Sequence, residues 1–242
     1  SDGGGAKLAA KLGHSIVPLK PSLVPLESDY PYVEALQGLS LRNVEATLLA
    51  DGKKIAKEFG EMLFTHFGVS GPIILSLSNV AAKALAEGRE VELDIDLKPA
   101  LAREKLDARI QRDFTQYSRK QLINGMKDLL PQRLIPVVLD MAYLDEEKFI
   151  NQVSKEERMR LLETLKCFVV PITATRPIAE AIVTAGGVDV KEINPKTMGS
   201  KLVGGLYFAG EVMDVDGYTG GFNLQAAFSS GYAAGLAASN LE

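Results

Sequence analysis

The glycines of this chain are distributed very unevenly. Of 22 glycines among 242 residues, 11 lie from Gly186 onward, whereas Gly125 is the only one between Arg89 and Ala185. Glycine disfavours helix interiors by about 1 kcal/mol, and it allows tight turns and close approach of the backbone to a ligand. The distribution therefore predicts a helical middle segment followed by a turn-rich segment in which the chemistry takes place.

Composition limits the class of protein. Hydrophobic residues make up 46% and charged residues 24% of the chain, as in soluble globular proteins. No apolar stretch approaches the roughly 18–20 residues of a membrane span, and no signal peptide opens the chain, so we expect a cytoplasmic protein without a membrane partner. The net charge of −4 argues against general coating of nucleic acids.

Side chains for thiol or metal chemistry are few. The single cysteine, Cys167, excludes an intramolecular disulfide and a dithiol relay, and we expect it to be a buried core thiol. The two histidines, His14 and His66, leave little for a metal site, so we predict none. His14 is placed at a helix end, where a cation is mildly stabilising.

Residues 15–98 follow a mainly β pattern. Three prolines within residues 15–26 indicate an extended edge segment, and residues 51–52 (Asp-Gly) predict a tight turn between two strands. Residues 89–97 alternate apolar and polar side chains, which is typical of a half-buried strand. This part of the chain is therefore predicted to be a sheet.

Helices are predicted at several places along the chain. One covers residues 72–87, with Ser70 as a candidate cap. From residue 99 to 166 the pattern is helical throughout, and three or four helices fit. Two pairs in this segment fit the capping box, Ser118 with Gln121 and Ser154 with Glu157. The chain then returns to predicted strands at 168–173, 178–184 and 206–209, and ends in a helix at 223–238.

The most specific local pattern lies near the C-terminus. An apolar stretch, interpreted as a strand, ends at Gly210-Glu211 and is followed by a polar glycine-rich loop and a helix that begins near Asn223. The N-terminus of a helix attracts electron-rich ligand atoms, and Gly220 with Gly221 would let a flat ligand approach the backbone. The alternative is a glycine-rich turn that binds no ligand.

This segment resembles the C-terminal signature of the BaiN/YhiN-like bacterial flavoproteins, a family of NAD(P)/FAD-dependent oxidoreductases. Residues 2–14, 60–72, 181–188 and 197–201 carry further resemblance, so the similarity covers essentially the whole chain. Gly199 stands where the family usually has Glu, so no role is assigned to that position.

The resemblance implies an α+β fold with a particular division of the chain. The expected parts are a remnant of an FAD-binding domain (1–14), a β-rich, barrel-like middle domain on the substrate side (15–98 and 165–185), a helical insertion (99–164) and the C-terminal part of the FAD-binding domain (186–242). The family's N-terminal βαβ unit with its phosphate loop would precede Ser1 and is absent. We therefore expect this chain alone to be inactive and to retain FAD weakly or not at all.

The resemblance also places the cofactor beside the C-terminal loop. The expected FAD-binding residues are Gly210, Glu211, Asp214, Asp216, Gly220, Gly221, Phe222, Asn223 and Leu224. The three acidic residues would border the flavin ring or ribitol; the alternatives are solvated loop carboxylates or a metal cluster.

Two further places could contact a substrate. Thr65 and His66, at a predicted strand end, are the candidate catalytic residues, which would orient the substrate or donate a proton. The alternative is that His66 ties the strand to the following helix. Arg176 either anchors a β segment or binds a substrate carboxylate.

Charge in the predicted helical insertion is asymmetric. Between residues 99 and 133 there are four acidic residues against eight lysines and arginines, which are Arg103, Lys105, Arg109, Arg112, Arg119, Lys120, Lys127 and Arg133. Such a run is either a solvated face or a docking face for an anionic partner such as RNA.

The resemblance implies an enzyme that passes hydride from NAD(P)H through FAD to an organic acceptor, with a conjugated C=C or C=O group as the expected target. Two alternatives remain: a flavoenzyme that modifies bases in structured RNA, and a non-catalytic interaction module. The sequence does not determine the substrate, the choice between NADH and NADPH, or the oligomeric state.

Overall fold

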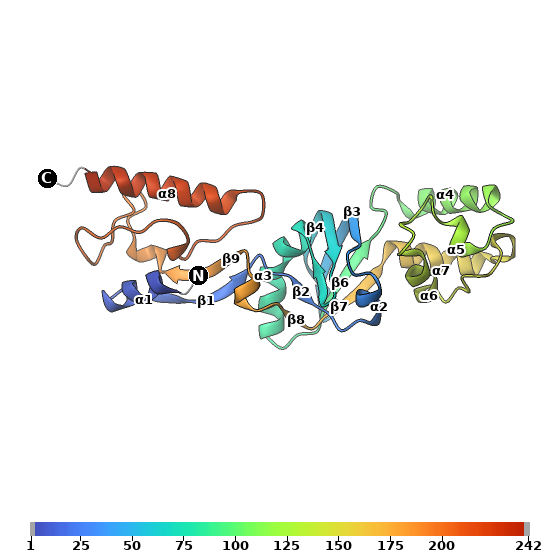
Figure 1. Ribbon diagram of the computed structural model, residues 1–242, viewed down its shortest axis with the longest axis horizontal. Helices are drawn as coiled ribbons and strands as arrows, with labels where there is room; N and C mark the ends of the chain where they lie inside the picture. Colours follow the sequence, from blue (N-terminus) through green and yellow to red (C-terminus); the bar gives the residue numbers. More distant parts are fainter. Residues whose placement is uncertain (1–2, 240–242) are drawn as a thin grey trace. The chain divides into compact units, whose positions relative to one another are not determined.

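Residues 3–239 are described by the structure, which is a computed structural model (Figure 1). They fall into two units. Unit 2 comprises Leu26–Ala174, and unit 1 comprises the segments before and after it, up to Pro25 and from Thr175. The outermost residues of the expected FAD-binding segments, 1–2 and 240–242, lie outside the described residues. In the described part of the chain, no helix is both long and apolar enough to span a membrane.

Unit 2 is built on a mostly antiparallel sheet with the strand order β7-β6-β3-β4-β5-β2-β8. The strands are β2 (Leu26–Glu27), β3 (Ser40–Ala50), β4 (Lys53–Phe64), β5 (Gly68–Ser70), β6 (Val91–Asp96), β7 (Phe168–Ile172) and β8 (Ala174–Thr175). The five neighbouring pairs from β7 to β2 are antiparallel. Together with the helices, the sheet confirms the predicted mixed α+β class.

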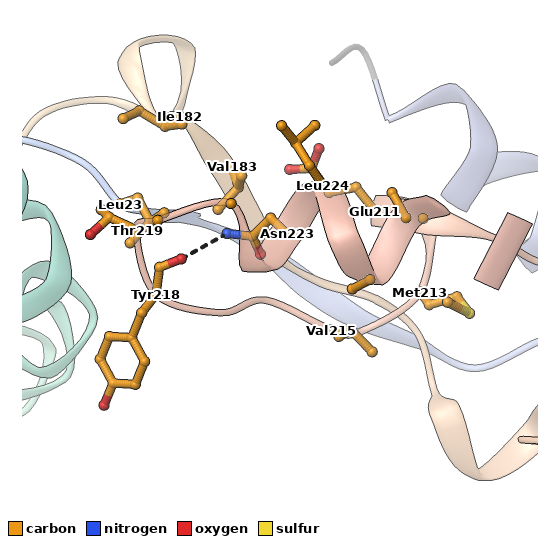
Figure 2. A pocket seen from close by; sticks show the side chains of 15 residues that line it. Leu23, Ile182, Val183, Glu211, Met213, Val215, Tyr218, Thr219, Asn223 and Leu224 are labelled. Carbon is orange, nitrogen blue, oxygen red and sulfur yellow. Dashed lines mark hydrogen bonds between the residues drawn. The ribbon is translucent and has the colours of Figure 1, made fainter. Parts of the chain in front are cut away.

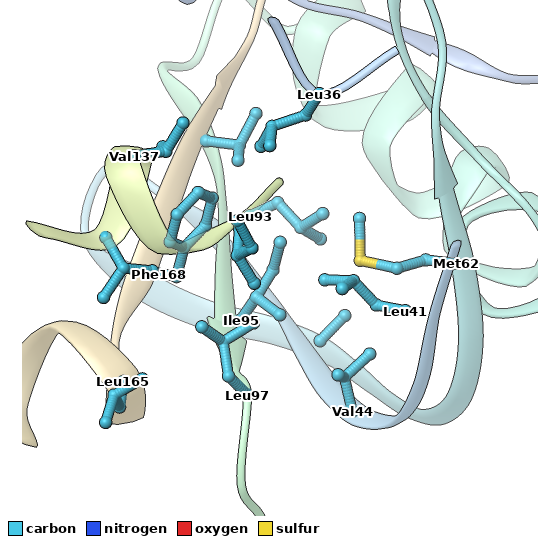
Figure 3. Packing of buried hydrophobic residues seen from close by; sticks show 14 of the residues in the cluster. Leu36, Leu41, Val44, Met62, Leu93, Ile95, Leu97, Val137, Leu165 and Phe168 are labelled. Atoms are coloured by element: carbon cyan, nitrogen blue, oxygen red, sulfur yellow. The ribbon is translucent and has the colours of Figure 1, made fainter. Parts of the chain in front are cut away.

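The central strands form as their sequence predicts. Asp51 and Gly52 adopt φ values of 51° and 70°, which close the β3–β4 hairpin as a tight turn. In β6, Val91, Leu93 and Ile95 are buried in the core of unit 2. Figure 3 shows Leu93 and Ile95 packed among residues of neighbouring strands and helices. Alternation of side chains across a strand therefore gives the sheet its apolar face.

Helix α3 (Pro72–Ala86) packs closely on β4. Its N-cap is Gly71 at φ 95°, with no side-chain cap, so the prediction of a Ser70 cap is wrong; Ser70 is the last residue of β5. A Cβ on Gly60 of β4 would lie 2.9 Å from Ile73 Cγ2. Glycine at this position is what allows the helix to approach the strand.

The helical insertion contains four α-helices and one short 3-10 helix, as predicted for a glycine-poor segment. They are α4 (Arg103–Gln116), α5 (Leu122–Gly125), α6 (Ile135–Met141), η1 (Ile150–Gln152) and α7 (Lys155–Lys166); α2 (Pro31–Ala35) precedes β3. The one glycine of this segment, Gly125, is explained by a tertiary contact, because a Cβ there would lie 2.1 Å from Ile150 Cδ1.

Of the two predicted capping boxes, one is present. Ser154 Oγ accepts from the Glu157 N–H at 3.2 Å, and the Glu157 carboxylate accepts from the Ser154 N–H at 2.8 Å, at the start of α7. The prediction of a capping box formed by Ser118 and Gln121 is wrong. Gln121 is extended and bridges to Phe149, so it is the N-cap of α5 and cannot be the third residue of a helix.

Unit 1 contains the chain's second sheet, the antiparallel pair β1–β9. Its elements are α1 (Gly4–Lys11), β1 (Ile16–Ser22), η2 (Ile178–Glu180), β9 (Val183–Val188), η3 (Val190–Glu192), η4 (Gly210–Val212) and α8 (Phe222–Ser239). A small apolar cluster that includes Ala9, Val188, Ile193 and Phe208 forms its core.

Two predicted strands of unit 1 are corrected. Residues 178–180 form a 3-10 turn, and the strand begins only at Val183, where β1 supplies its partner. Residues 206–209 form no strand, because within the described chain their only bridge joins Tyr207 to Gly199. An apolar stretch becomes a strand only where a neighbouring strand pairs with it.

Cys167 is exposed, so the prediction of a buried core thiol is wrong. It follows α7 and precedes β7, in which Phe168, Val170 and Ile172 are buried. Because side chains alternate across a strand, Cys167 falls on the opposite side from Phe168. Desolvation and the Asp94 carboxylate raise the pKa of the thiol to about 11.

Candidate functional site

A cavity of unit 1 with a volume of about 460 Å³ lies beside the predicted cofactor loop (Figure 2). Its walls come from the end of β1, the start of β9, η4, the following loop and the first turns of α8. The lining residues are Leu23, Ile182, Val183, Gly210, Glu211, Met213, Val215, Tyr218, Thr219, Gly220, Gly221, Asn223, Leu224, Ala226 and Ala227. Six of the nine expected cofactor residues are therefore among them, and Asp214, Asp216 and Phe222 are not.

The loop that enters α8 depends on glycine. Gly210, Gly220 and Gly221 have φ values of 69°, 101° and 92°, a region that other residues adopt only with strain. A Cβ on Gly221 would meet no atom within 4 Å, so the space next to this backbone is open. The first N–H groups of α8, which have no acceptor within the helix, lie at the same place.

Asn223 shapes this loop. Its Oδ1 accepts from the Gly217 N–H at 2.8 Å, and its Nδ2 donates to the Gly217 carbonyl at 3.0 Å and toward the Tyr218 carbonyl at 3.5 Å (Figure 2). Both ends of the amide are therefore engaged by the backbone. Asn223 holds the loop open rather than offering its side chain to a ligand.

The three acidic residues tie the loop to the paired strands β1 and β9. Glu211 accepts from the backbone N–H and the hydroxyl of Thr184, the latter at 3.1 Å. Asp214 accepts from the Gly186 N–H at 3.1 Å, and Asp216 accepts from the Ser22 hydroxyl at 2.7 Å. Among residues 3–239, no group of three or more His, Cys, Asp or Glu side chains is arranged to hold a metal ion.

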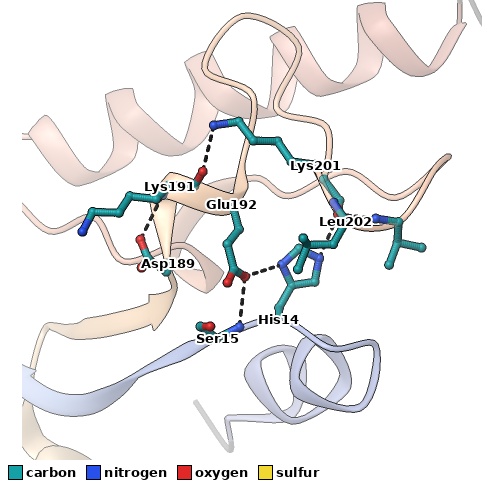
Figure 4. Close-up of polar contacts among 9 residues, drawn as sticks. His14, Ser15, Asp189, Lys191, Glu192, Lys201 and Leu202 are labelled. Carbon is teal, nitrogen blue, oxygen red and sulfur yellow. Dashed lines mark hydrogen bonds and ion pairs between the residues drawn. The ribbon is translucent and has the colours of Figure 1, made fainter.

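A partly buried polar network around His14 links the segment after α1 to η3 and the residues that follow it (Figure 4). His14 Nδ1 lies 3.0 Å from Glu192 Oε2, and His14 Nε2 lies 2.8 Å from Ser200 Oγ. The hydrogen bonds from Ser15 to Glu192, and then the one from His14, lower the pKa of the Glu192 carboxyl. Sequence reasoning missed this network, because no local signal joins residues so far apart.

The hydrogen bonds of this network join a serine to a histidine and the histidine to a glutamate, which is also the arrangement of a hydrolytic triad. However, Ser200 Oγ accepts hydrogen bonds from the N–H groups of Leu202 and Val203, at 3.0 and 2.9 Å. Its lone pairs are thus occupied by its own turn, and none of the described cavities is lined by Ser200. The network is a structural clamp of unit 1.

The candidate catalytic residues belong to unit 2, in the turn between β4 and β5. Thr65 Oγ1 is buried and has no hydrogen-bond partner among the described residues, although the Thr65 N–H donates to the Gly68 carbonyl at 2.9 Å. His66 is exposed, and its ring meets the Phe67 ring edge-on at 4.9 Å. A buried hydroxyl without a partner is uncommon in folded proteins.

Arg176 and Gly199 have local roles. Arg176 Nε donates to Glu180 Oε2 at 2.9 Å, and the Arg176 N–H donates to the Pro25 carbonyl at 2.9 Å, so this residue anchors the chain as expected. A Cβ on Gly199 would lie 3.3 Å from Thr197 Oγ1 and 3.4 Å from the Tyr207 ring, which leaves little room for a side chain.

Comparison with known proteins places this arrangement in a family. The family described as "HI0933-like protein barrel and H2TH domain" matches residues 20–183. The chain belongs to the HI0933-like family. The match confirms the resemblance that the motifs indicated. The family's description, a barrel and an H2TH domain, applies to residues 20–183 of this chain.

Curated relatives of this HI0933-like chain act on two different kinds of molecule. A 3-dehydro-bile acid delta(4,6)-reductase of Clostridium scindens is 31% identical over 240 residues, which is 98% of this chain and 58% of the relative. Ribosomal RNA dihydrouridine synthases of Haemophilus influenzae and Escherichia coli are 34% and 31% identical, over 97% and 95% of the chain. The chain spans 55% and 54% of these two proteins, so it covers little more than half of each relative.

Proposed function

We propose that this chain forms the substrate side and the flavin-ring side of a reductase that acts on a C=C bond conjugated to a carbonyl group. The observation that carries the proposal is the cavity of about 460 Å³ enclosed by the Gly220–Gly221 turn and the N-terminus of α8. Cavities of this size hold small ligands and cofactors. Its apolar walls and exposed backbone fit a flat ring with one polar edge.

The names of the relatives support the choice of acceptor. A 3-dehydro bile acid with double bonds at positions 4 and 6 is a conjugated dienone. Dihydrouridine is uridine whose ring C=C bond, conjugated to a carbonyl, has been reduced. Although a steroid and an RNA differ greatly in size, the bond that is reduced has the same electronic character in both.

The residues of the chain would prepare the cavity for the cofactor. When bound, a flavin supplies hydride from its N5 atom after it has been reduced by NAD(P)H. The first N–H groups of α8 and the helix dipole would favour negative charge on the pyrimidine edge of the ring. Leu23, Ile182 and Met213 would exclude water from its apolar part.

Reduction of a conjugated C=C bond adds hydride to the β-carbon and a proton to the α-carbon. We assign the proton to the β4–β5 turn. The buried Thr65 hydroxyl has no hydrogen-bond partner among the described residues. His66 is exposed and can exchange a proton with solvent. In this assignment exposed His66 supplies the proton, and the buried Thr65 hydroxyl positions the turn that carries it.

One face of α8 supports the proposal that residues 186–239 are part of a larger FAD-binding domain. Leu224, Phe228, Tyr232 and Leu236 recur every fourth residue and are 64%, 69%, 71% and 50% exposed. Residues four apart share one face of a helix, so these side chains form a continuous apolar stripe. We infer that other elements of the complete polypeptide cover this stripe, as the greater length of the relatives permits.

The test is flavin content and turnover. The complete polypeptide that carries this chain should bind FAD and oxidise NADH or NADPH in the presence of a conjugated enone, but not of the corresponding saturated ketone. The 242-residue chain alone should retain FAD weakly, because it spans little more than half the length of its relatives. A complete polypeptide that cannot be reconstituted with FAD would refute the proposal and favour an interaction module.

A second candidate acceptor is a uracil base within RNA. It is favoured by one observation of unit 2, an excess of cations over acids on one surface of the helical insertion, and by the names of two relatives. This surface can be examined independently of the flavin site.

A further inference from the structure

The cations of the helical insertion gather on one face of α4 and the loop that follows it. Lys105, Arg109 and Arg112 are spaced by four and three residues, so they share one face of α4. Leu106 and Ile110 are buried on another face, against the core of unit 2. The three cations of α4 and three cations of the following loop make up the α4 cationic face, which is defined as Lys105, Arg109, Arg112, Arg119, Lys120 and Lys127.

Hydrogen bonds hold the loop against the helix. Arg109 Nη2 donates to the Asp128 carbonyl at 3.4 Å, which brings the neighbouring Lys127 beside α4. The Tyr117 hydroxyl donates to the Asp128 carboxylate, and Lys120 Nζ lies 4.3 Å from the centre of the Tyr117 ring. Lys120 and Lys127 therefore lie beside α4, and Arg119 is the neighbour of Lys120 in the chain.

Most of this charge is not neutralised. Lys105, Arg112, Arg119 and Lys127 are exposed, and none has a hydrogen-bond or ion-pair acceptor among the described residues.

Two of the nearby acids form ion pairs, one of them with Arg109 of the α4 cationic face. Asp113 accepts from Arg109 at 2.7 Å, and Asp107 accepts from Arg158 at 2.8 Å. Residues 99–133 still hold eight cations against four acids, and such an excess of positive charge on a protein of net charge −4 marks a surface for a polyanion.

An exposed aromatic ring lies at the edge of the same surface. Phe149 is 46% exposed and pairs in an antiparallel bridge with Gln121, next to Lys120. The Ile150 N–H donates to the Lys120 carbonyl at 3.0 Å, which fixes this neighbourhood. Unstacked bases of single-stranded RNA pack on exposed aromatic rings, whereas duplexes, acidic proteins and anionic lipids do not need one.

We propose that the α4 cationic face and Phe149 bind a single-stranded or looped segment of RNA. The cations neutralise the phosphates, and the ring stacks on one base. The proposal rests on the proposed function, since the bound RNA is taken to carry the conjugated C=C bond that is reduced. It names RNA as the substrate class.

The experiment measures binding of the 242-residue chain to a fluorescent RNA hairpin with a uridine-rich loop, by anisotropy over a range of salt concentrations. The test variant combines Lys105→Gln, Arg112→Gln, Arg119→Gln and Lys127→Gln. The control variant removes the same charge from exposed lysines elsewhere, through Lys11→Gln, Lys54→Gln, Lys83→Gln and Lys196→Gln. Circular dichroism checks that all variants fold.

The test variant should bind the hairpin at least about tenfold more weakly, and its plot of log Kd against log salt should flatten by about 3, from four lost phosphate contacts. The control variant should bind nearly as the unchanged chain does. Phe149→Ala should weaken binding to the looped RNA by roughly tenfold and leave binding to a fully paired duplex unchanged.

Three results would overturn the proposal: equal losses in the test and control variants, no effect of Phe149→Ala, or tighter binding to an acidic protein or to phosphatidylserine vesicles than to RNA. Failure of the proposed function looks different. The complete polypeptide would then lack FAD and enone reduction while RNA binding persisted. If only the docking proposal fails, the test variant keeps both reduction of a small enone and the unchanged chain's affinity for RNA.

Discussion

Ser200 Oγ lies 2.8 Å from His14 Nε2, across 186 positions of the sequence, while His14 Nδ1 meets Glu192 at 3.0 Å. The His14 side chain is fully buried, and its ring also packs edge-on against Phe208 at 4.8 Å. This contact joins the start of unit 1 to the segment that leads into the cofactor loop. It explains why a lone histidine without a catalytic role occupies this position.

Loss of the clamp should destabilise the protein. We expect His14→Ala to lower the free energy of unfolding by roughly 2–4 kcal/mol, because it removes buried hydrogen bonds and ring packing. Ser200→Ala should cost about 1–3 kcal/mol, since it leaves two N–H groups without an acceptor. Urea denaturation measures both. Exposed Ser40→Ala is the control and should stay within about 0.5 kcal/mol.

The same network should have no hydrolytic activity. Because two N–H groups occupy the lone pairs of Ser200 Oγ, we expect no hydrolysis of p-nitrophenyl esters and no labelling by a fluorophosphonate probe. Stoichiometric labelling that Ser200→Ala abolishes would contradict the assignment of a structural clamp.

A side chain on Gly221 should strain the backbone of the cofactor loop without a steric clash with neighbouring atoms. Gly221→Ala should cost roughly 1–2 kcal/mol of stability, because φ is 92° although the Cβ meets no atom within 4 Å. In the complete polypeptide it should also weaken FAD binding. Gly235→Ala, within α8 and equally uncrowded, is the matched control and should stabilise the helix by about 0.5–1 kcal/mol. Unchanged FAD affinity in Gly221→Ala would argue against this loop as the ring site.

The Thr65 hydroxyl should matter for turnover more than for folding. Thr65→Val removes a buried hydroxyl without a described partner, so stability should be unchanged or slightly higher. In the complete polypeptide, the rate of enone reduction should nevertheless fall. His66→Gln should lower kcat by about 10²-fold and leave FAD content unchanged, as expected for a proton donor. Normal turnover in both variants would remove the β4–β5 turn from the proposed mechanism.

Cys167 should react slowly with alkylating reagents despite its exposure. Desolvation and Asp94 raise the pKa of the thiol to about 11, so little thiolate is present near neutral pH. The rate of reaction with iodoacetamide should rise steeply only toward that pH, and earlier in Asp94→Asn. A thiol that holds its proton more tightly in the folded state stabilises the fold below the pKa of the unfolded chain. That contribution is lost as pH rises toward about 11. An alkylation profile centred near pH 8.5 would contradict the assignment.

Local patterns predicted much of unit 2. The alternation around β6, the Asp51–Gly52 turn and the Ser154–Glu157 capping box each depend on residues within a few positions of one another, and all three are present. The Ser118 box failed for a tertiary reason, since pairing of Gln121 with Phe149 extends the backbone where a helix was expected. A motif of two residues has no information about such a distant partner.

For the candidate cofactor loop, the sequence predicted the positions of the glycines but not the hydrogen bonds of the side chains. Gly210, Gly220 and Gly221 do adopt the conformations that favour glycine. The side chains of Asp214, Asp216 and Asn223, however, are engaged by the backbone and by β1, which the sequence could not show.

The uneven glycines of the sequence by themselves predicted the helical segment at 99–166 and the turn-rich segment after it, because backbone freedom is a property of each residue and its near neighbours. Only the tertiary structure decided that Gly125 gives space to Ile150, that Cys167 faces outward, and that His14 joins Glu192 and Ser200. These relationships join residues far apart in the chain. Their energies come from packing and burial, which exist only once the chain has folded.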